Sequence, residues 1–151
     1  MSLESDIAVL ASVPLFAGLD GDQLRLLAFG AEHRRLRRGE TLFRMAARSD
    51  AGFVVVTGEV ELLRQKGETQ ISAGVYGPGT LLGEFALLTE TRRPATAVTR
   101  TDCDFIRIAR PLFRRMLEEY PEIARKLHER IADDLARMTA DILSLEDAFR
   151  G

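Results

Sequence analysis

The segment at residues 83–96 limits what this chain can form more strongly than any other. It reads Gly-Glu-Phe-Ala-Leu-Leu-Thr-Glu-Thr-Arg-Arg-Pro-Ala-Thr and follows a Gly-Pro-Gly turn at residues 77–79. Gly83 has no Cβ and lets the backbone approach a ligand closely. The short apolar run after it predicts one or two helical turns, whose free N–H groups attract an anion.

Two charged side chains in this segment suit the two ends of one ligand. Arg93 offers a planar fork of donors that can bind two phosphate oxygens at once. Glu84 accepts hydrogen bonds when it is ionised, and a sugar hydroxyl can supply them. A surface ion pair between the two side chains is the alternative interpretation. The arrangement favours a ligand with hydroxyl groups at one end and a compact anion at the other.

The same segment resembles the phosphate-binding cassette of the cyclic nucleotide-binding domain family. That family includes the sensor domains of catabolite-activator-like regulators and of cyclic-nucleotide-gated channels. Its usual pattern is G-E-x-A-L-x-x-x-x-x-R-[AST]-A-[TS], and the resemblance extends from about Val13 to the helix after Pro121. Seven positions match the pattern in register: Gly83, Glu84, Ala86, Leu87, Arg93, Ala95 and Thr96.

The resemblance implies a regulatory module that binds a cyclic nucleotide and relays its occupancy through a C-terminal helix, without a catalytic step, cofactor or metal. By resemblance, Arg93 contacts the cyclic phosphate, Glu84 the ribose 2′-hydroxyl, and the backbone of the next two residues the phosphate. The terminal helix supplies a lid whose residue is not specified. The implied ligand-binding residues are Gly83, Glu84, Phe85, Ala86, Arg93, Pro94 and Ala95, with Ile71 and Val75 on the base side.

Two residues depart from the family pattern. Pro94 offers neither an N–H nor a hydroxyl where Ala, Ser or Thr is usual. The loss of a hydrogen bond to a charged group costs about 1.5–3 kcal/mol, which is about tenfold to a hundredfold in affinity. A threonine there resembles the feature that favours cyclic GMP, so cyclic AMP is the favoured ligand and cyclic GMP the second choice. Glu90 adds a carboxylate near the expected phosphate, and Arg92 is the nearest candidate counter-charge.

These departures keep a second function open, namely a dimerisation or docking module that retains the fold and ignores nucleotides. An enzyme is the least favoured class. Double-sheet rolls also host metal-dependent enzymes, which require clustered histidine and carboxylate ligands. The only histidines are His33 and His128, and Cys103, the single cysteine, has no histidine nearby in sequence.

The rest of the sequence predicts one domain, mainly β with flanking helices. Its 151 residues are 46% hydrophobic with a net charge of −2, and no apolar run approaches a membrane span. The chain is therefore expected to be cytoplasmic, with no general attraction to nucleic acid or membrane. The expected parts are N-terminal helices at residues 1–31, a double-sheet β-roll at residues 32–109 and C-terminal helices at residues 110–151.

Local signals refine these parts. Asp20 and Gln23 form a capping-box signal for the second helix, whose Leu24 and Leu27 face the core, with Phe29 as a further candidate. Four arginines at residues 34–38 would suit nucleic acid, but on a strand they point to both faces. A solvated edge strand is therefore favoured over a nucleic-acid site.

The last helix carries an apolar stripe with two interpretations. One is a helix that lies along its own β-roll. The other is a two-stranded coiled-coil seam that makes a homodimer, and both can hold for different halves. Resembling transcription factors carry a DNA-binding domain after this helix. We therefore expect no DNA binding by these residues, whether the protein is a free-standing sensor or part of a longer regulator. The seam residues are Leu135, Met138, Ile142, Leu145 and Phe149.

Overall fold

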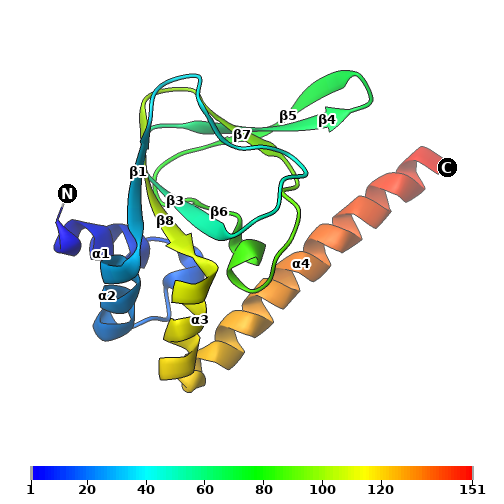
Figure 1. Cartoon of the computed structure of the whole chain (residues 1–151). Helices are drawn as coiled ribbons and strands as arrows, with labels where there is room; N and C mark the ends of the chain where they lie inside the picture. The colour runs from blue at the N-terminus through cyan, green and yellow to red at the C-terminus, as the bar shows by residue number, and fades with distance from the viewer. Residues whose placement is uncertain (1, 151) are drawn as a thin grey trace.

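A computed structural model describes the backbone of residues 2–150 and the side chains of residues 2–134 and 136–137. Helices stand at both ends of the chain and strands between them (Figure 1). The helical elements are α1 (Leu3–Ala11), η1 (Pro14–Phe16), α2 (Gly21–Gly30), the 3-10 turn η2 (Glu84–Leu87), α3 (Arg110–Glu119) and α4 (Pro121–Arg150). The strands are β1 (Glu32–Leu36), β2 (Thr41–Phe43), β3 (Ala51–Thr57), β4 (Val60–Lys66), β5 (Thr69–Tyr76), β6 (Leu81–Leu82), β7 (Thr96–Thr99) and β8 (Cys103–Ala109).

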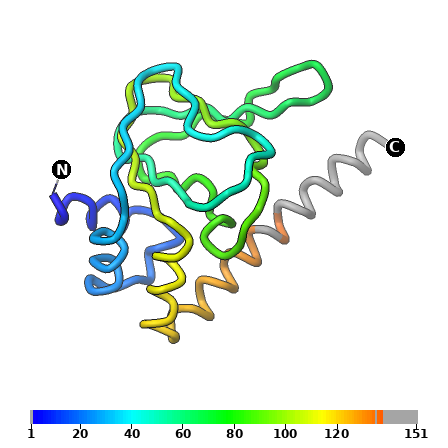
Figure 2. Tube along the Cα trace, viewed as in Figure 1, coloured from blue at the N-terminus to red at the C-terminus, as the bar shows by residue number. Residues whose placement is uncertain are grey.

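The strands form two four-stranded sheets in which every pairing is antiparallel. One sheet has the order β1-β8-β3-β6 and the other the order β2-β7-β4-β5. The helices α1, α2 and α3 gather on the side of the first sheet, whereas the β4–β5 hairpin projects away from the body (Figures 1 and 2). The predicted double-sheet β-roll is confirmed.

The central strands of the first sheet, β3 and β8, are buried on both faces, which explains the unbroken apolar run in β3. Val54 packs against the helices, and Phe53 and Val55 face the second sheet. On β8, Ile106 joins the helical core and Phe105 the core between the sheets. Because side chains alternate along a strand, a sheet covered on both faces needs apolar residues at consecutive positions. This sheet therefore forms a common wall of the two cores.

The N-terminal helices follow their sequence signals with one exception. Asp20 and Gln23 form the predicted capping box, each side chain bonding the other's backbone N–H at 2.9 Å. Leu24 and Leu27 are buried as predicted. Phe29, however, is 82% exposed, so its assignment to the core was wrong. The helix turns Leu27 inward, and a residue two positions later lies on a different face.

Arg34 and Arg35 lie in β1, which is an edge strand of the first sheet as predicted, whereas Arg37 and Arg38 follow the end of this strand. The charged side chains of β1 contact neighbouring elements of the domain. The Nε atom of Arg35 lies 2.8 Å from the Asp104 carboxylate, and the Arg34 guanidinium stands 5.9 Å from the centre of the Phe53 ring. His33 in the same strand contacts Asp6 of α1 at 2.8 Å. These contacts join β1 to its neighbours, which is the structural role that the favoured interpretation assigns to it.

The first part of α4 lies along the domain. Leu127 and Ile131 are buried in the helical core, and Ile123 packs against it. This is the packing that a helix lying along its own β-roll requires. The five residues of the predicted coiled-coil seam fall outside the side chains that the structure describes, so the homodimer stays a prediction.

Candidate ligand-binding site

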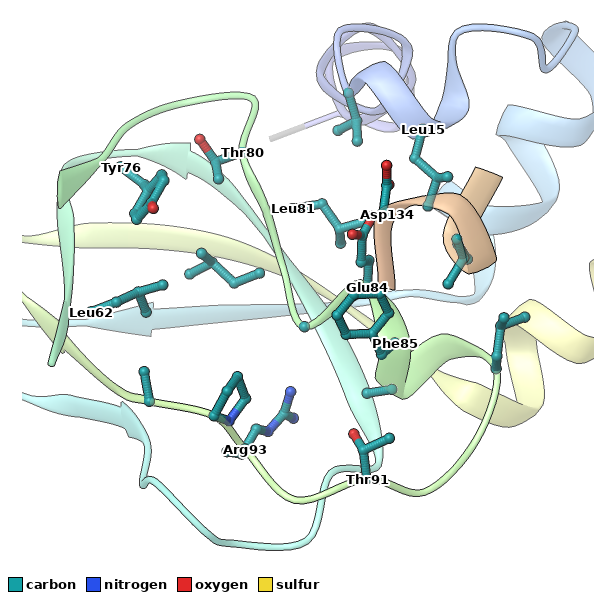
Figure 3. Close-up of a pocket in the computed structure, with 18 of the residues that line it drawn as sticks. Leu15, Leu62, Tyr76, Thr80, Leu81, Glu84, Phe85, Thr91, Arg93 and Asp134 are labelled. Carbon is teal, nitrogen blue, oxygen red and sulfur yellow. The ribbon is translucent and has the colours of Figure 1, made fainter. Parts of the chain in front are cut away.

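A cavity of about 1050 Å³ opens between the second sheet, the segment 83–95 and α4. Figure 3 shows side chains from all three parts around the same hollow. Its volume is at the upper end of the range for small-molecule sites. Four arginines against two carboxylates make its lining net positive among the described residues, which suits an anionic ligand. These charged residues are Arg64, Arg92, Arg93 and Arg130 against Glu84 and Asp134.

Gly83 and Arg93 fit together at the wall of this cavity. Gly83 has φ of +81°, in the left-handed region that glycine adopts without strain. A Cβ at this position would lie 2.4 Å from Nη1 of Arg93, so the missing side chain leaves the space that the guanidinium fills. The pairing explains why the residue before Glu84 must be glycine.

The Arg93 guanidinium is buried but not fully bonded. The residue is 4% exposed, its Nη2 donates to the Ala51 carbonyl oxygen at 2.8 Å, and it lies over the Phe43 ring at 4.3 Å. Burial lowers the pKa of Arg93, and Arg107 and Arg110 act in the same direction against Asp50. Among the side chains that the structure describes, Nη1 has no hydrogen-bond partner. A buried cation with an open donor is stabilised by an anion.

Glu84 faces the cavity from η2 and is half-buried. Burial is the largest cause that raises the pKa of Glu84 from 4.5 to about 7, followed by the charge of Asp134 and a hydrogen bond to it. Arg130 and Arg137 oppose this shift. Glu84 and Arg93 thus lie in one cavity and do not form the surface ion pair that was the alternative interpretation.

The segment after Gly83 is a single 3-10 turn of four residues, within the predicted one or two helical turns. The Ala86 N–H already donates to the Gly83 carbonyl oxygen at 3.1 Å. At the other end of the turn, Nε of Arg110 donates to the Ala86 carbonyl oxygen at 2.8 Å. Nη2 of Arg110 donates to the Ser49 carbonyl oxygen. Arg110 therefore holds the turn to the loop before β3.

We expect Arg110→Ala to lower the free energy of unfolding by about 1–3 kcal/mol, because two half-buried carbonyl groups lose a charged donor. Chemical denaturation measures this change. Arg114→Ala is the matched control, since Arg114 lies on the same helix with an exposed side chain and one long bond of 3.3 Å to the Leu88 carbonyl oxygen. Equal effects of the two substitutions would contradict the role of Arg110.

The structure brings most of the predicted site residues together and leaves two outside. The seven cassette residues Gly83, Glu84, Phe85, Ala86, Arg93, Pro94 and Ala95 all line the cavity. Ile71 and Val75 do not, and they are 44% and 46% exposed. Val75 pairs with Glu61 and points to the face opposite its neighbour Tyr76, whereas Ile71 pairs with Arg64 further along the hairpin.

Other residues supply the apolar wall on that side. Leu62 on β4, Tyr76 on β5 and Phe43 on β2 line the cavity. The Tyr76 hydroxyl donates to the Ala73 carbonyl oxygen at 3.2 Å, which orients the ring. The alternation of polar and apolar residues at the start of β4 is the sequence pattern from which Leu62 could have been predicted to face inward. On β5 this pattern does not predict the inward-facing residues, because the register shift between Leu62 and Leu63 marks a bulge, and a bulge changes which residues share a face.

The two departures from the family pattern have different structural settings. Pro94 is exposed and lies at the cavity lining. Glu90 is absent from the described lining, and its carboxylate lies 3.4 Å from Nε of Arg48. Arg92, the counter-charge expected from sequence, instead donates to the Ala46 carbonyl oxygen at 3.2 Å. Repulsion between Glu90 and a bound anion is therefore reduced.

Metal clusters and membrane-spanning helices are absent from the part of the chain that the structure describes. Among the side chains of residues 2–134 and 136–137, no group of three or more His, Cys, Asp or Glu lies close enough to hold a metal ion. Cys103 is a free, buried cysteine in β8. No helix among the described residues has both the length and the hydropathy needed to cross a bilayer.

Comparison with known proteins matches this site to a family. The family model for the cyclic nucleotide-binding domain matches residues 33–120, which is more than half of the chain. The cyclic AMP receptor protein of Thermus thermophilus is 30% identical over 138 residues, covering 89% of this chain and 64% of the relative. The chain therefore spans less than two thirds of that relative's length.

Two solved structures agree in sequence and fold. A cyclic nucleotide-binding-like protein from Brucella abortus is 43% identical with a TM-score of 0.69, covering 75% of this chain and 97% of the other. The N-terminal domain of a transcriptional regulator from Streptomyces coelicolor is 31% identical with a TM-score of 0.77, covering 86% of this chain and 94% of the other. The chain belongs to the family of cyclic nucleotide-binding domains.

Proposed function

We propose that residues 1–151 form one regulatory unit that binds cyclic AMP in the cavity and transmits its occupancy through α4. The observation that carries this proposal is the buried Arg93 guanidinium, whose Nη1 has no hydrogen-bond partner among the described side chains. A cyclic phosphate beside Nη1 supplies the missing acceptor and the counter-charge together. The name of the Thermus thermophilus relative supports cyclic AMP as the nucleotide.

The cavity also has groups that suit the ribose and the base of the ligand. Glu84, once ionised, accepts hydrogen bonds from the ribose 2′-hydroxyl. Leu62 and Tyr76 form an apolar wall against which a purine base can pack. Pro94 has no hydroxyl group, and the lack of a hydroxyl group at this place favours cyclic AMP over cyclic GMP. Because residues of α4 line the same cavity, a ligand that binds more tightly to one helix position shifts the helix.

We expect calorimetric titration with cyclic AMP to give a saturable heat, with a smaller affinity for cyclic GMP. At a ligand concentration of about 100 Kd, binding adds about 2.7 kcal/mol to the free energy of unfolding. For a chain of this length the midpoint of thermal unfolding then rises by roughly 5–10 °C. The absence of both heat and thermal shift at millimolar cyclic AMP would contradict the proposal.

The second candidate is a docking or dimerisation module that ignores nucleotides. Its support is Pro94, whose ring removes one donor from the cassette. Light scattering with and without cyclic AMP separates the two functions. A homodimer whose mass and thermal stability are unaffected by ligand would favour the docking module. The pairing of Glu90 with Arg48 weakens this candidate, because it removes one of the two sequence arguments for it.

A further inference from the structure

Glu84 meets an acidic residue of α4 at the end of the cavity. Figure 3 shows the Asp134 carboxyl group next to that of Glu84, with Arg93 on a different wall of the same hollow. The two acidic residues are 50 positions apart in sequence, and η2 and α4 are in contact. After burial, the interaction with Asp134 is the next cause that raises the pKa of Glu84. The residue proposed to recognise the sugar is therefore already engaged by the helix in this structure.

A hydrogen bond between two carboxyl groups needs one proton, because two carboxylates can only accept. Arg137 forms an ion pair with Asp134. Glu84, whose pKa is raised to about 7, then carries the proton and donates it to Asp134. The other charged or titratable groups that face this end of the cavity or line it are Arg64 of β4, Tyr76 of β5, Arg92 and Arg93 of the cassette, and His128 and Arg130 of α4.

The two contacts favour different protonation states of the same carboxyl group. The ionised form of Glu84 is the stronger acceptor for a ribose hydroxyl, whereas a hydrogen bond to the Asp134 carboxylate needs the protonated form. Building on the proposed function, we infer that Glu84 and Asp134 form a one-proton carboxyl pair that holds α4 against the cavity, and that ligand binding separates the pair and releases its proton to solvent. Cyclic nucleotide binding and proton release are then one linked event.

The sign of the pH dependence follows from this linkage. Below pH 7 the pair is protonated, and each unit of falling pH weakens binding by up to about tenfold. Above pH 7 Glu84 is ionised, the two carboxylates repel each other, and affinity becomes constant. Affinity for cyclic AMP is therefore expected to be about tenfold lower at pH 6 than at pH 8. Protonation of a histidine such as His128 would have the opposite sign, since an imidazolium attracts an anion.

The test is calorimetry of cyclic AMP binding at pH 6 and pH 8, each in two buffers that differ in ionisation enthalpy. The wild type should release close to one proton at pH 6, almost none at pH 8, and show the tenfold change in affinity. Asp134→Ala removes the acidic neighbour, so that burial alone raises the pKa of Glu84, and Arg130 and Arg137 oppose it. The ratio of the two affinities should then fall below about threefold, mainly because binding at pH 6 becomes tighter.

Asp133→Ala is the matched control, because this residue has the same charge, is exposed on the same helix and does not line the cavity. It should keep the wild-type ratio. Binding that is equal at pH 6 and pH 8 without proton release would overturn the carboxyl pair and leave the nucleotide function standing. An Asp134→Ala variant that keeps the tenfold ratio between the affinities at pH 8 and pH 6 would also overturn the carboxyl pair. No binding by the wild type at either pH would instead reject the proposed function.

Discussion

Replacing Arg93 with methionine is expected to abolish tight nucleotide binding without destabilising the ligand-free protein. The guanidinium fork makes up to two hydrogen bonds to the phosphate, each contributing about 1.5–3 kcal/mol, so affinity for cyclic AMP should fall about a hundredfold to ten-thousandfold. Methionine keeps an unbranched chain against Phe43 and Phe53, over whose rings the guanidinium lies. Removing an incompletely bonded buried charge is neutral or stabilising.

Calorimetry and denaturant unfolding test both halves of this expectation. Without ligand, the variant should be as stable as the wild type or up to about 2 kcal/mol more stable. With saturating cyclic AMP the order reverses, because only the wild type gains stability from binding. Arg100→Met is the control: Arg100 is exposed, forms an ion pair with Glu61 at 3.4 Å and does not line the cavity. An Arg93→Met protein that still binds cyclic AMP would show that the anion site lies elsewhere.

Gly83→Ala is expected to damage the same site from the backbone side. Alanine in the left-handed region costs about 1–2 kcal/mol, and its Cβ would lie 2.4 Å from Nη1 of Arg93. Either the guanidinium or the turn η2 must move. We therefore expect a loss of stability of about 1–3 kcal/mol together with a loss of cyclic AMP affinity of at least about a hundredfold. Thermal unfolding and calorimetry measure the two effects.

Gly67→Ala separates backbone strain from the clash. Gly67 also has a left-handed φ of +63°, but a Cβ there would meet nothing within 4 Å at the tip of the β4–β5 hairpin. The free energy of unfolding of the Gly67→Ala variant should fall by about 1 kcal/mol, while its affinity for cyclic AMP is unchanged. If the two alanine variants lose affinity equally, the fit between Gly83 and Arg93 is not what builds the site.

Sequence was sufficient where the determinants of structure are local. The cassette needs Gly83 for a left-handed turn and Arg93 ten residues later, and both requirements can be read from one short segment. The capping box at Asp20 depends on residues three apart. The burial of both faces of β3, in contrast, is evident only from the helices and the second sheet that pack against it.

Sequence was insufficient where distant elements meet. Asp134 reaches Glu84 only because α4 folds back past η2, and no local pattern encodes that contact. Ile71 and Val75 were assigned to the site from resemblance, yet the hairpin pairing places Tyr76 and Leu62 at the cavity instead. A register shift of one residue is enough to change which side chain faces the hollow.

The turn η2 belongs to the cavity and to the helical core at once. Glu84 at its start faces the cavity, whereas Leu87 at its end is completely buried among the helices. A single turn of four residues is too short to bend within itself, so a displacement at one end moves the other. Close-packed interiors do not absorb such a displacement locally. Helix α3, which contacts η2, is thus connected to the cavity by a route that does not run through α4.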